Sequence, residues 1–329
     1  MNILYAIQGT GNGHLSRASD VGPALEKHGK VDYFISGAQA DIGLSVPIQY
    51  KSPGLSFYFG KRGGVDFLQT YRKNSSKRIY KEIKDFPVDK YDLVINDFEP
   101  ITAWASKLKG KKCIALSHQS ALLSDICPKP KSSDLIGQTI LKKYAPASEH
   151  YGFHFSAFDQ NIYTPVVRKA IRELEVSDLD HYTVYLPAYS DEKLISKLSQ
   201  VKDVKWQVFS KHAKECYEFK NVRIHPIDNE KFMESFSSCH GVLCGAGFEM
   251  PSEALFLGKK LMVIPMKNQY EQQCNAAALR ELGVSMMKKL GDNSVKKIKK
   301  WILEGEAIKV DYPDETQEIV DLIVKRAKV

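Results

Sequence analysis

Residues 3–17 read ILYAIQGTGNGHLSR, in which an apolar run of five residues is followed by a glycine-rich turn. Leu15, Ala18, Val21 and Leu25 then recur at helical spacing. The stretch therefore predicts a buried strand, a tight turn and an amphipathic helix, which together form the first unit of an α/β fold.

The same alternation continues along the chain. In the first half, short apolar runs predict strands over 3–7, 31–35, 92–96, 112–116 and 160–163. After Pro165, a second series predicts strands over 183–187, 204–209, 222–225, 241–244 and 261–264. Because helical patterns separate the runs, we expect two doubly wound, Rossmann-like domains with parallel sheets, over 1–164 and 165–312. A terminal helix over 313–329 follows, for which packing back on the first domain is one arrangement.

Composition excludes several classes of protein. The chain has 329 residues, of which 43% are hydrophobic, so it can fill two cores and is not predicted to be disordered. No window reaches the roughly 18 to 20 apolar residues of a membrane span. The six cysteines form no CxxC pair, which favours reduced thiols in the cytoplasm and predicts no metal site.

Part of the net charge of +8 is concentrated in one stretch. Between Lys61 and Lys84 the sequence carries eight basic residues against Asp66 and Glu82. Together with the aromatic residues from Phe57 onward, this range, 57–84, predicts contact with an anionic membrane surface or an anionic acceptor. The alternative is that these charged residues form the solvent-exposed face of a helix. No nucleic-acid partner is expected, since no reading motif accompanies the charge.

The turn after the first strand predicts an anion site. Gly11 and Gly13 let the backbone approach a ligand closely, and the amides at the start of the helix favour negative charge. A dinucleotide fingerprint would need glycine where His14 stands and an acid after the second strand, which reads Phe34-Ile35-Ser36-Gly37. We therefore expect no nicotinamide or flavin cofactor.

His14 is the candidate general base. An imidazole at the carboxyl end of a central strand lies where ligands bind and accepts a proton near neutral pH. Asp97 ends a neighbouring predicted strand and is placed to orient it, although Asp97 could instead cap the helix that begins near Pro100. The alternative is that His14 only packs at the start of the helix and takes no part in catalysis. His118, after strand 112–116, is a weaker candidate for the same cleft, on the acceptor side.

A second motif follows strand 241–244. Gly245, Ala246, Gly247 and Phe248 form another glycine turn that opens a helix, and so predict a second anion-binding helix terminus. Ser252 and Glu253 lie one turn further on, and Glu253 has the length to pair with ribose hydroxyls. Glu271 and Gln272 follow the next strand and can reach sugar hydroxyls.

These two motifs resemble the inverting GT-B glycosyltransferases. Within this class, the sequence is most similar in pattern to the peptidoglycan lipid-linked N-acetylglucosaminyltransferase and the UDP-glucuronosyltransferases. Two patterns carry the similarity: Gly-Thr-Gly-x-Gly-His at 9–14, and Gly-Ala-Gly, Ser-Glu-Ala, Gly, Pro and Glu-Gln-x-x-Asn-Ala over 245–276. The resemblance implies two domains facing a central cleft. It also implies a nucleoside-diphosphate sugar as donor and a hydroxyl-bearing glycan or lipid-linked acceptor, without an essential metal.

The resemblance also implies roles for single residues. The turn 245–248 would face the diphosphate, Glu253 the ribose, Ile227 the base, and Glu271 with Gln272 the transferred sugar. His14 would deprotonate the acceptor. Relatives carry histidine or arginine at the position of Gly245, so here the diphosphate would depend on amides or on another cation such as Arg17.

The sequence is compatible with three functions. The first is an inverting transferase in the cytoplasm, or at the inner face of the cell membrane, that builds a lipid-linked or cell-envelope glycan. The second is a nucleotide-sugar hydrolase or epimerase of the same fold, because a similar Gly-His-x-x-Arg occurs in such hydrolases. The third is a nucleotide-sugar-binding subunit without catalysis.

Overall fold

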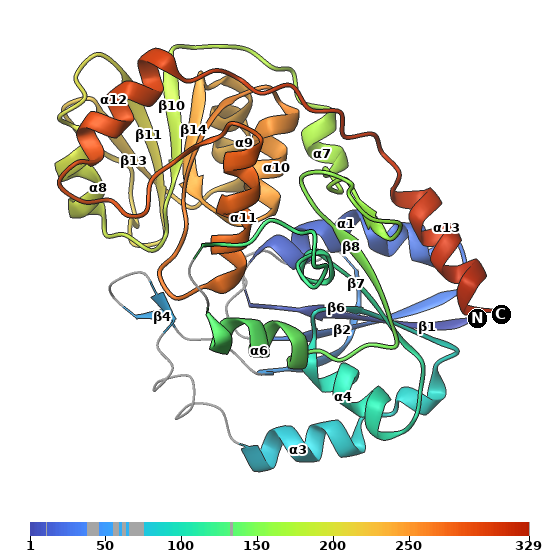
Figure 1. Cartoon of the computed structure of the whole chain (residues 1–329). Helices are drawn as coiled ribbons and strands as arrows, with labels where there is room; N and C mark the ends of the chain where they lie inside the picture. Colours follow the sequence, from blue (N-terminus) through green and yellow to red (C-terminus); the bar gives the residue numbers. More distant parts are fainter. Residues whose placement is uncertain are drawn as a thin grey trace.

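The computed structural model describes residues 1–10, 12–37, 46–54, 59–60, 64–65, 76–131 and 134–328. Within these residues the chain forms two seven-stranded sheets, and a further pair of short strands, β4 (Phe59–Gly60) and β5 (Gly64–Val65), forms a two-stranded sheet. Figure 1 shows the two large sheets in separate lobes, the first drawn mainly in blue and green and the second in yellow and orange. Helices lie against both sheets.

The first sheet has the strand order β3-β2-β1-β6-β7-β8-β9, and all of its described pairings are parallel. Its strands are β1 (Asn2–Gln8), β2 (Lys30–Ser36), β3 (Ile48–Ser52), β6 (Leu93–Asp97), β7 (Cys113–Ser117), β8 (Glu149–Phe153) and β9 (Ile162–Tyr163). The chain builds outward from β1 in one direction to β3 and then in the other from β6. The carboxyl ends of β1 and β6 therefore lie at the switch point, where open α/β sheets bind ligands.

Helices cover both faces of this sheet. Helix α1 (Asn12–Glu26) buries the predicted stripe of Leu15, Ala18, Val21 and Leu25. Helices α3 (Ser76–Asp85) and α4 (Pro100–Leu108) pack together on the other face. Because β1 and β6 are covered on both sides, their sequences are apolar almost throughout rather than alternating. The short helices α5 (His118–Ala121) and α6 (Leu135–Lys143) follow β7.

The second sheet repeats this plan, with the order β12-β13-β11-β10-β14-β15-β16, except that its edge strand β12 is antiparallel to β13. Its strands are β10 (His181–Tyr185), β11 (Lys205–Ser210), β12 (Tyr217–Phe219), β13 (Val222–Pro226), β14 (Gly241–Gly245), β15 (Lys260–Ile264) and β16 (Ser285–Met286). Its helices are α8 (Asp191–Leu198), α9 (Asn229–Ser238), α10 (Glu249–Phe256), α11 (Tyr270–Glu281) and α12 (Ser294–Glu304). The switch point lies between β10 and β14, so the glycine turn after β14 begins at a ligand-binding edge.

Two segments join the lobes. Helix α7 (Lys169–Arg172) lies in the passage from the first lobe to the second, and helix α13 (Thr316–Ala327) returns to lie beside α1, so the two ends of the chain are neighbours (Figure 1). His28 and Asp321 join α13 to the end of α1 through a contact of 2.7 Å. The Tyr312 hydroxyl also donates to the backbone oxygen of Phe155 at 3.0 Å.

Candidate functional site

His14 lies in the first turn of α1, and Asp97 is the last residue of β6. The structure brings them together, with His14 Nδ1 2.8 Å from Asp97 Oδ1. Burial alone would raise the pKa of Asp97, but Arg17 and His14 beside it hold that pKa below its ordinary value. An ionised carboxylate only accepts hydrogen bonds, so Nδ1 carries the proton and, in the neutral ring, the lone pair is on Nε2. This is the protonation state that a general base requires.

The alternative interpretation of Asp97, as the cap of the following helix, is wrong. Helix α4 is capped by Glu99, whose two carboxylate oxygens accept from the backbone nitrogens of Ile101 and Thr102, each at 2.7 Å. Asp97 is thereby left to its side-chain partners.

Arg17 joins the two lobes. Its guanidinium Nη2 donates to both oxygens of Asp97, at 2.7 and 2.8 Å, and its Nη1 donates to Glu249 in the first turn of α10. Burial opposes the charge of Arg17, but Asp97 and Glu249 outweigh it and raise the pKa of the guanidinium. Burial raises the pKa of Glu249 to about 7, even though Arg17 acts in the opposite direction.

Two helix N-termini meet at this point. A Cβ atom at Gly13 would come within 3.0 Å of Glu249 Cγ, so the first turn of α1 lies directly against the side chain of Glu249 at the start of α10. Helix α10 starts after Phe248, which makes no side-chain cap bond, and a Cβ at Gly247 would meet only open space. Phe248 thus offers no side-chain cap to the amides that begin α10, and these amides suit an anion. Gly11 lies outside the described residues.

The other residues of the second motif have partners within the protein. Ser252 is buried, and its hydroxyl donates to the backbone oxygen of Phe248 at 2.8 Å. Glu253 is also buried, and its two oxygens accept from Arg168 Nε and Nη2 at 2.5 and 2.9 Å. A ribose contact by Glu253 would have to share or replace this ion pair. Ile227 is 42% exposed, in the connection that follows β13.

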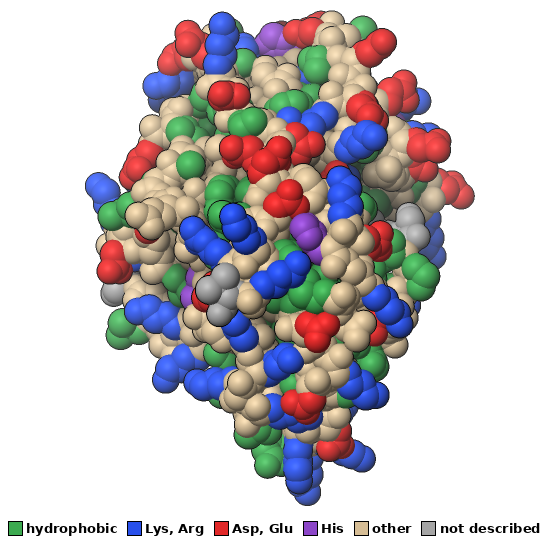
Figure 2. All heavy atoms as spheres, turned by 90° about the vertical axis from the view of Figure 1, so that its right-hand side faces the viewer, with side chains coloured by type: hydrophobic (Ala, Val, Ile, Leu, Met, Phe, Trp, Pro, Cys, Tyr) green, Lys and Arg blue, Asp and Glu red, His purple; other side chains and the backbone are tan. Residues whose placement is uncertain are grey.

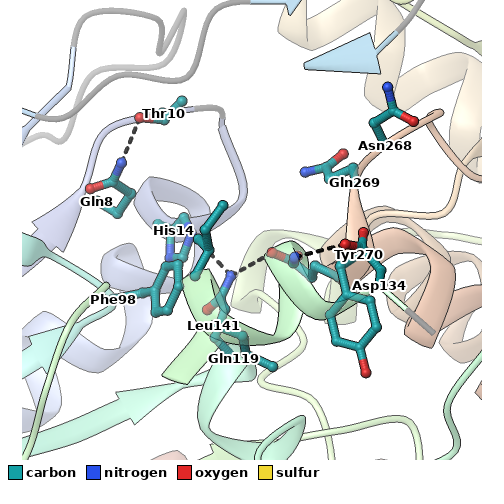
Figure 3. A pocket seen from close by; sticks show the side chains of 13 residues that line it. Gln8, Thr10, His14, Phe98, Gln119, Asp134, Leu141, Asn268, Gln269 and Tyr270 are labelled. Carbon is teal, nitrogen blue, oxygen red and sulfur yellow. Dashed lines mark hydrogen bonds between the residues drawn. The ribbon is translucent and has the colours of Figure 1, made fainter. Parts of the chain in front are cut away.

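A pocket of about 130 Å³ opens between the lobes (Figure 3). Its walls come from the strand ends of the first lobe, from α6 and from the start of α11, and its residues are Gln8, Thr10, His14, Phe98, Gln119, Asp134, Gly137, Ile140, Leu141, Asn268, Gln269, Tyr270 and Glu271. Thus His14 and Glu271 line one cavity. Gln272 faces the turn after β15, where its Oε1 accepts from the Met266 nitrogen at 2.9 Å.

His118 lies behind the wall of the pocket rather than on it. Its ring stacks on Phe248 with centroids 3.9 Å apart, and its nitrogens contact the Phe153 oxygen at 2.8 Å and Asn275 Oδ1 at 2.7 Å. Burial lowers the pKa of His118 to about 3. In place of the expected acceptor contact, His118 makes a contact between the lobes, because Asn275 and Phe248 belong to the second lobe.

Three functional candidates were missed in the sequence. Glu249 stands inside the second motif, where its charge was a signal, whereas Gln119 and Arg168 have no local pattern around them. In the described ranges no group of three or more His, Cys, Asp or Glu side chains is arranged to hold a metal. Of the basic stretch 57–84, residues 57–58, 61–63 and 66–75 lie outside the described residues, and the structure shows the remainder mainly as α3.

The sequence matches the model of a known family, described as glycosyl transferase family 1, over residues 1–304. The chain belongs to this family. A search of curated proteins gave no match. Both the family resemblance and the expected fold, two Rossmann-like domains of GT-B type, are confirmed.

Several solved structures share the fold across the whole chain. MurG of Acinetobacter baumannii is 14% identical, with a TM-score of 0.59, and the match covers 98% of this chain and 99% of that one. UGT89C1 of Arabidopsis thaliana, solved with UDP, is 12% identical with a TM-score of 0.58, and both chains are covered completely. UGT2 of Phytolacca americana, solved with UDP-2-fluoroglucose and pterostilbene, is 12% identical with a TM-score of 0.55, over 99% and 94% of the two chains.

Proposed function

We propose that this family 1 protein is an inverting glycosyltransferase that moves a sugar from a nucleoside-diphosphate sugar to a hydroxyl group. The observation that carries the proposal is the His14–Asp97 pair at the rim of the interlobe pocket that Glu271 also lines. The neighbours solved with UDP and UDP-2-fluoroglucose make UDP-sugars the first donors to test.

The reaction follows from the groups present. His14 Nε2 takes the proton of the acceptor hydroxyl, and the oxygen attacks the anomeric carbon from the side opposite the diphosphate. The bond from that carbon to the diphosphate oxygen breaks, and its electron pair leaves with the diphosphate. Amides at the start of α10 stabilise the leaving charge, and Asp97 stabilises the imidazolium. We propose that no metal is needed for this step.

A donor panel tests the proposal. UDP-, GDP- and dTDP-sugars at millimolar concentration should raise the melting temperature if they bind the folded protein. Turnover is then followed with and without candidate acceptors, in EDTA and in magnesium. A product of inverted anomeric configuration, formed equally in EDTA, supports the proposal. Free sugar released without an acceptor would show a hydrolase instead, and binding without any turnover would show a non-catalytic subunit.

For the acceptor we propose a lipid-linked glycan of the cell envelope, reached at the inner face of the membrane. Helices α3 and α4 present their outward faces side by side, with exposed Tyr80, Trp104 and Leu108 among lysines. These lysines are Lys77, Lys81, Lys84 and Lys107. Figure 2, seen from the side of α13, shows basic side chains more frequent toward the lower end, where α3 and α4 lie in Figure 1. Exposed aromatic rings among lysines suit an anionic lipid surface.

One structural observation bears on this proposed membrane contact. No helix in the described part of the chain is long and apolar enough to cross a bilayer. Sedimentation with vesicles of phosphatidylcholine, with and without phosphatidylglycerol, tests the contact at low and high salt. We expect binding to the anionic vesicles that salt weakens and that Trp104→Ser with Leu108→Ser reduces. Absence of binding at low salt would remove the membrane proposal and leave the transferase proposal intact.

A further inference from the structure

Gln119 lies beside His14 in the pocket (Figure 3), and its side-chain amide contacts both His14 and Glu271. It lies in the short helix α5 and is 3% exposed. Its amide nitrogen donates to Glu271 Oε2 at 2.9 Å and lies 3.5 Å from His14 Nε2. His14 belongs to the first lobe and Glu271 to the second. One amide group therefore joins the proposed base to the carboxylate proposed to hold the transferred sugar.

The partners decide which way this amide points. A carboxylate can only accept, so the nitrogen of Gln119 and not its oxygen faces Glu271. The same nitrogen then has a second hydrogen for His14. Since Asp97 holds the proton on Nδ1, the Nε2 lone pair faces that hydrogen. The arrangement matches neutral His14 and would oppose a proton on Nε2. A contact of 3.5 Å is long for a hydrogen bond, so an entering hydroxyl can take its place.

Packing alone does not account for Gln119. Its Oε1 is buried and has no hydrogen-bond partner among the described residues. An unpaired buried oxygen lowers stability, and an apolar side chain of similar size would avoid that cost. The contacts of the amide nitrogen with Glu271 and His14 therefore account for Gln119 better than packing does.

We propose that Gln119 is a positioning residue that couples the base to the sugar-binding carboxylate across the lobes. It keeps Glu271 oriented in the pocket and keeps the Nε2 lone pair of His14 in the plane where the acceptor hydroxyl arrives. This inference rests on the proposed function, since it assigns a third residue to the same site.

Variants of Gln119 test the coupling with the donor and acceptor found in the panel. Gln119→Ala should lower kcat about 10- to 100-fold, because a hydrogen bond to a charged group is lost, while donor affinity measured by calorimetry stays within about threefold. Gln119→Glu should be slower than Gln119→Ala, because a carboxylate would face Glu271. Gln200→Ala is the matched control, since Gln200 is exposed and its side-chain amide donates to the backbone oxygen of Ser196, away from the pocket.

Two further readouts separate positioning from structural support. The acidic limb of the kcat/KM profile should move to higher pH in Gln119→Ala, because the amide favours unprotonated His14. In a double-mutant cycle, the effect of Gln119→Ala should shrink in a Glu271→Ala background. Gln119→Met, which keeps the side-chain length, replaces the alanine variant if that variant melts early, and it should show the same loss of kcat.

The outcomes distinguish this inference from the proposed function. Unchanged kcat and an unchanged pH profile in the Ala, Met and Glu variants of an active enzyme would overturn the positioning role alone. Loss of donor affinity with kcat preserved would overturn it too, since Gln119 would then be a donor-binding residue. A wild-type protein that neither binds nor transfers any sugar would remove the proposed function, and this inference with it.

Discussion

At the scale of single residues, Asp97 is the centre of the buried charge cluster. It is fully enclosed and contacts both His14 and Arg17. Asn at this position would keep the shape but lose the charge that fixes the His14 proton on Nδ1 and stabilises the imidazolium.

We therefore expect Asp97→Asn to lower kcat about 10²- to 10⁴-fold. Removing the charge also leaves Arg17 with Glu249 alone, so the free energy of unfolding should fall by about 3–5 kcal/mol. Asp178→Asn is the control, because Asp178 pairs with His240 at the surface. Steady-state kinetics with urea unfolding measure both effects, and an Asp97→Asn enzyme as fast as the wild type would contradict the assignment.

Because of His118, we expect the free energy of unfolding to depend on pH. Burial lowers its pKa from 6.5 to about 3 in the folded protein. A lowered folded pKa gives stability that is present above the unfolded value and is lost as the pH falls from about 6.5 toward 3. The slope is at most one proton, or about 1.4 kcal/mol per pH unit.

Urea unfolding of the wild type and of His118→Gln checks this between pH 7.5 and 4. The advantage of the wild type should shrink as the pH falls. His154, whose pKa is also lowered by burial, to about 4, stacks beside His118 and helps to lower the pKa of His118, so the same comparison in a His154→Gln background separates the two contributions. A difference that stays constant with pH would show that His118 does not titrate as described.

At the scale of elements, α13 fastens the end of the chain to the first lobe. Ile319, Val320, Ile323 and Val324 are buried in the core cluster that also contains the apolar side of α1. Ile323→Ala should therefore lower the free energy of unfolding by about 2–5 kcal/mol. Leu303→Ala, on α12 and 82% exposed, should change it by less than about 0.5 kcal/mol. Equal effects of the two variants would show that α13 is not a structural part of the fold.

Elements with strong local patterns were predictable from sequence, and others were not. Strands β1 and β14 are nearly continuous apolar runs followed by glycine, which marks buried strands of a parallel sheet. Strands β3, with sequence IQYKS, and β12, with YEF, were missed because they lie at sheet edges and carry polar or exposed residues. Strand β8, EHYGF, and helix α6 were missed because nearby prolines at 128, 130 and 146 obscure their periodicity.

The residues of the site, too, were predictable only where a local sequence pattern marks them. His14 and Asp97 were predictable because each ends or follows a central strand, so topology alone brings them together. Gln119 and Glu271 are 152 positions apart, and Glu253 and Arg168 are 85 apart. Such contacts depend on how two lobes meet, which no local pattern in the sequence encodes.

At the scale of the whole molecule, Glu253 and Arg168 tie the second lobe to the segment that joins the lobes. Glu253→Gln should lower the free energy of unfolding by about 3–5 kcal/mol, because Arg168 would remain largely buried without its partner charge. Thermal unfolding with and without donor measures this. Unchanged stability with lost donor affinity would instead assign Glu253 to the ribose alone.

The central claim is that His14, on one lobe, deprotonates an acceptor that attacks a sugar held by the other. The most direct measurement compares kcat and donor affinity of His14→Ala with those of the wild type, using one verified donor and acceptor. We predict that kcat falls about 10²- to 10⁴-fold while the donor dissociation constant stays within about threefold. Full turnover by His14→Ala would contradict the account.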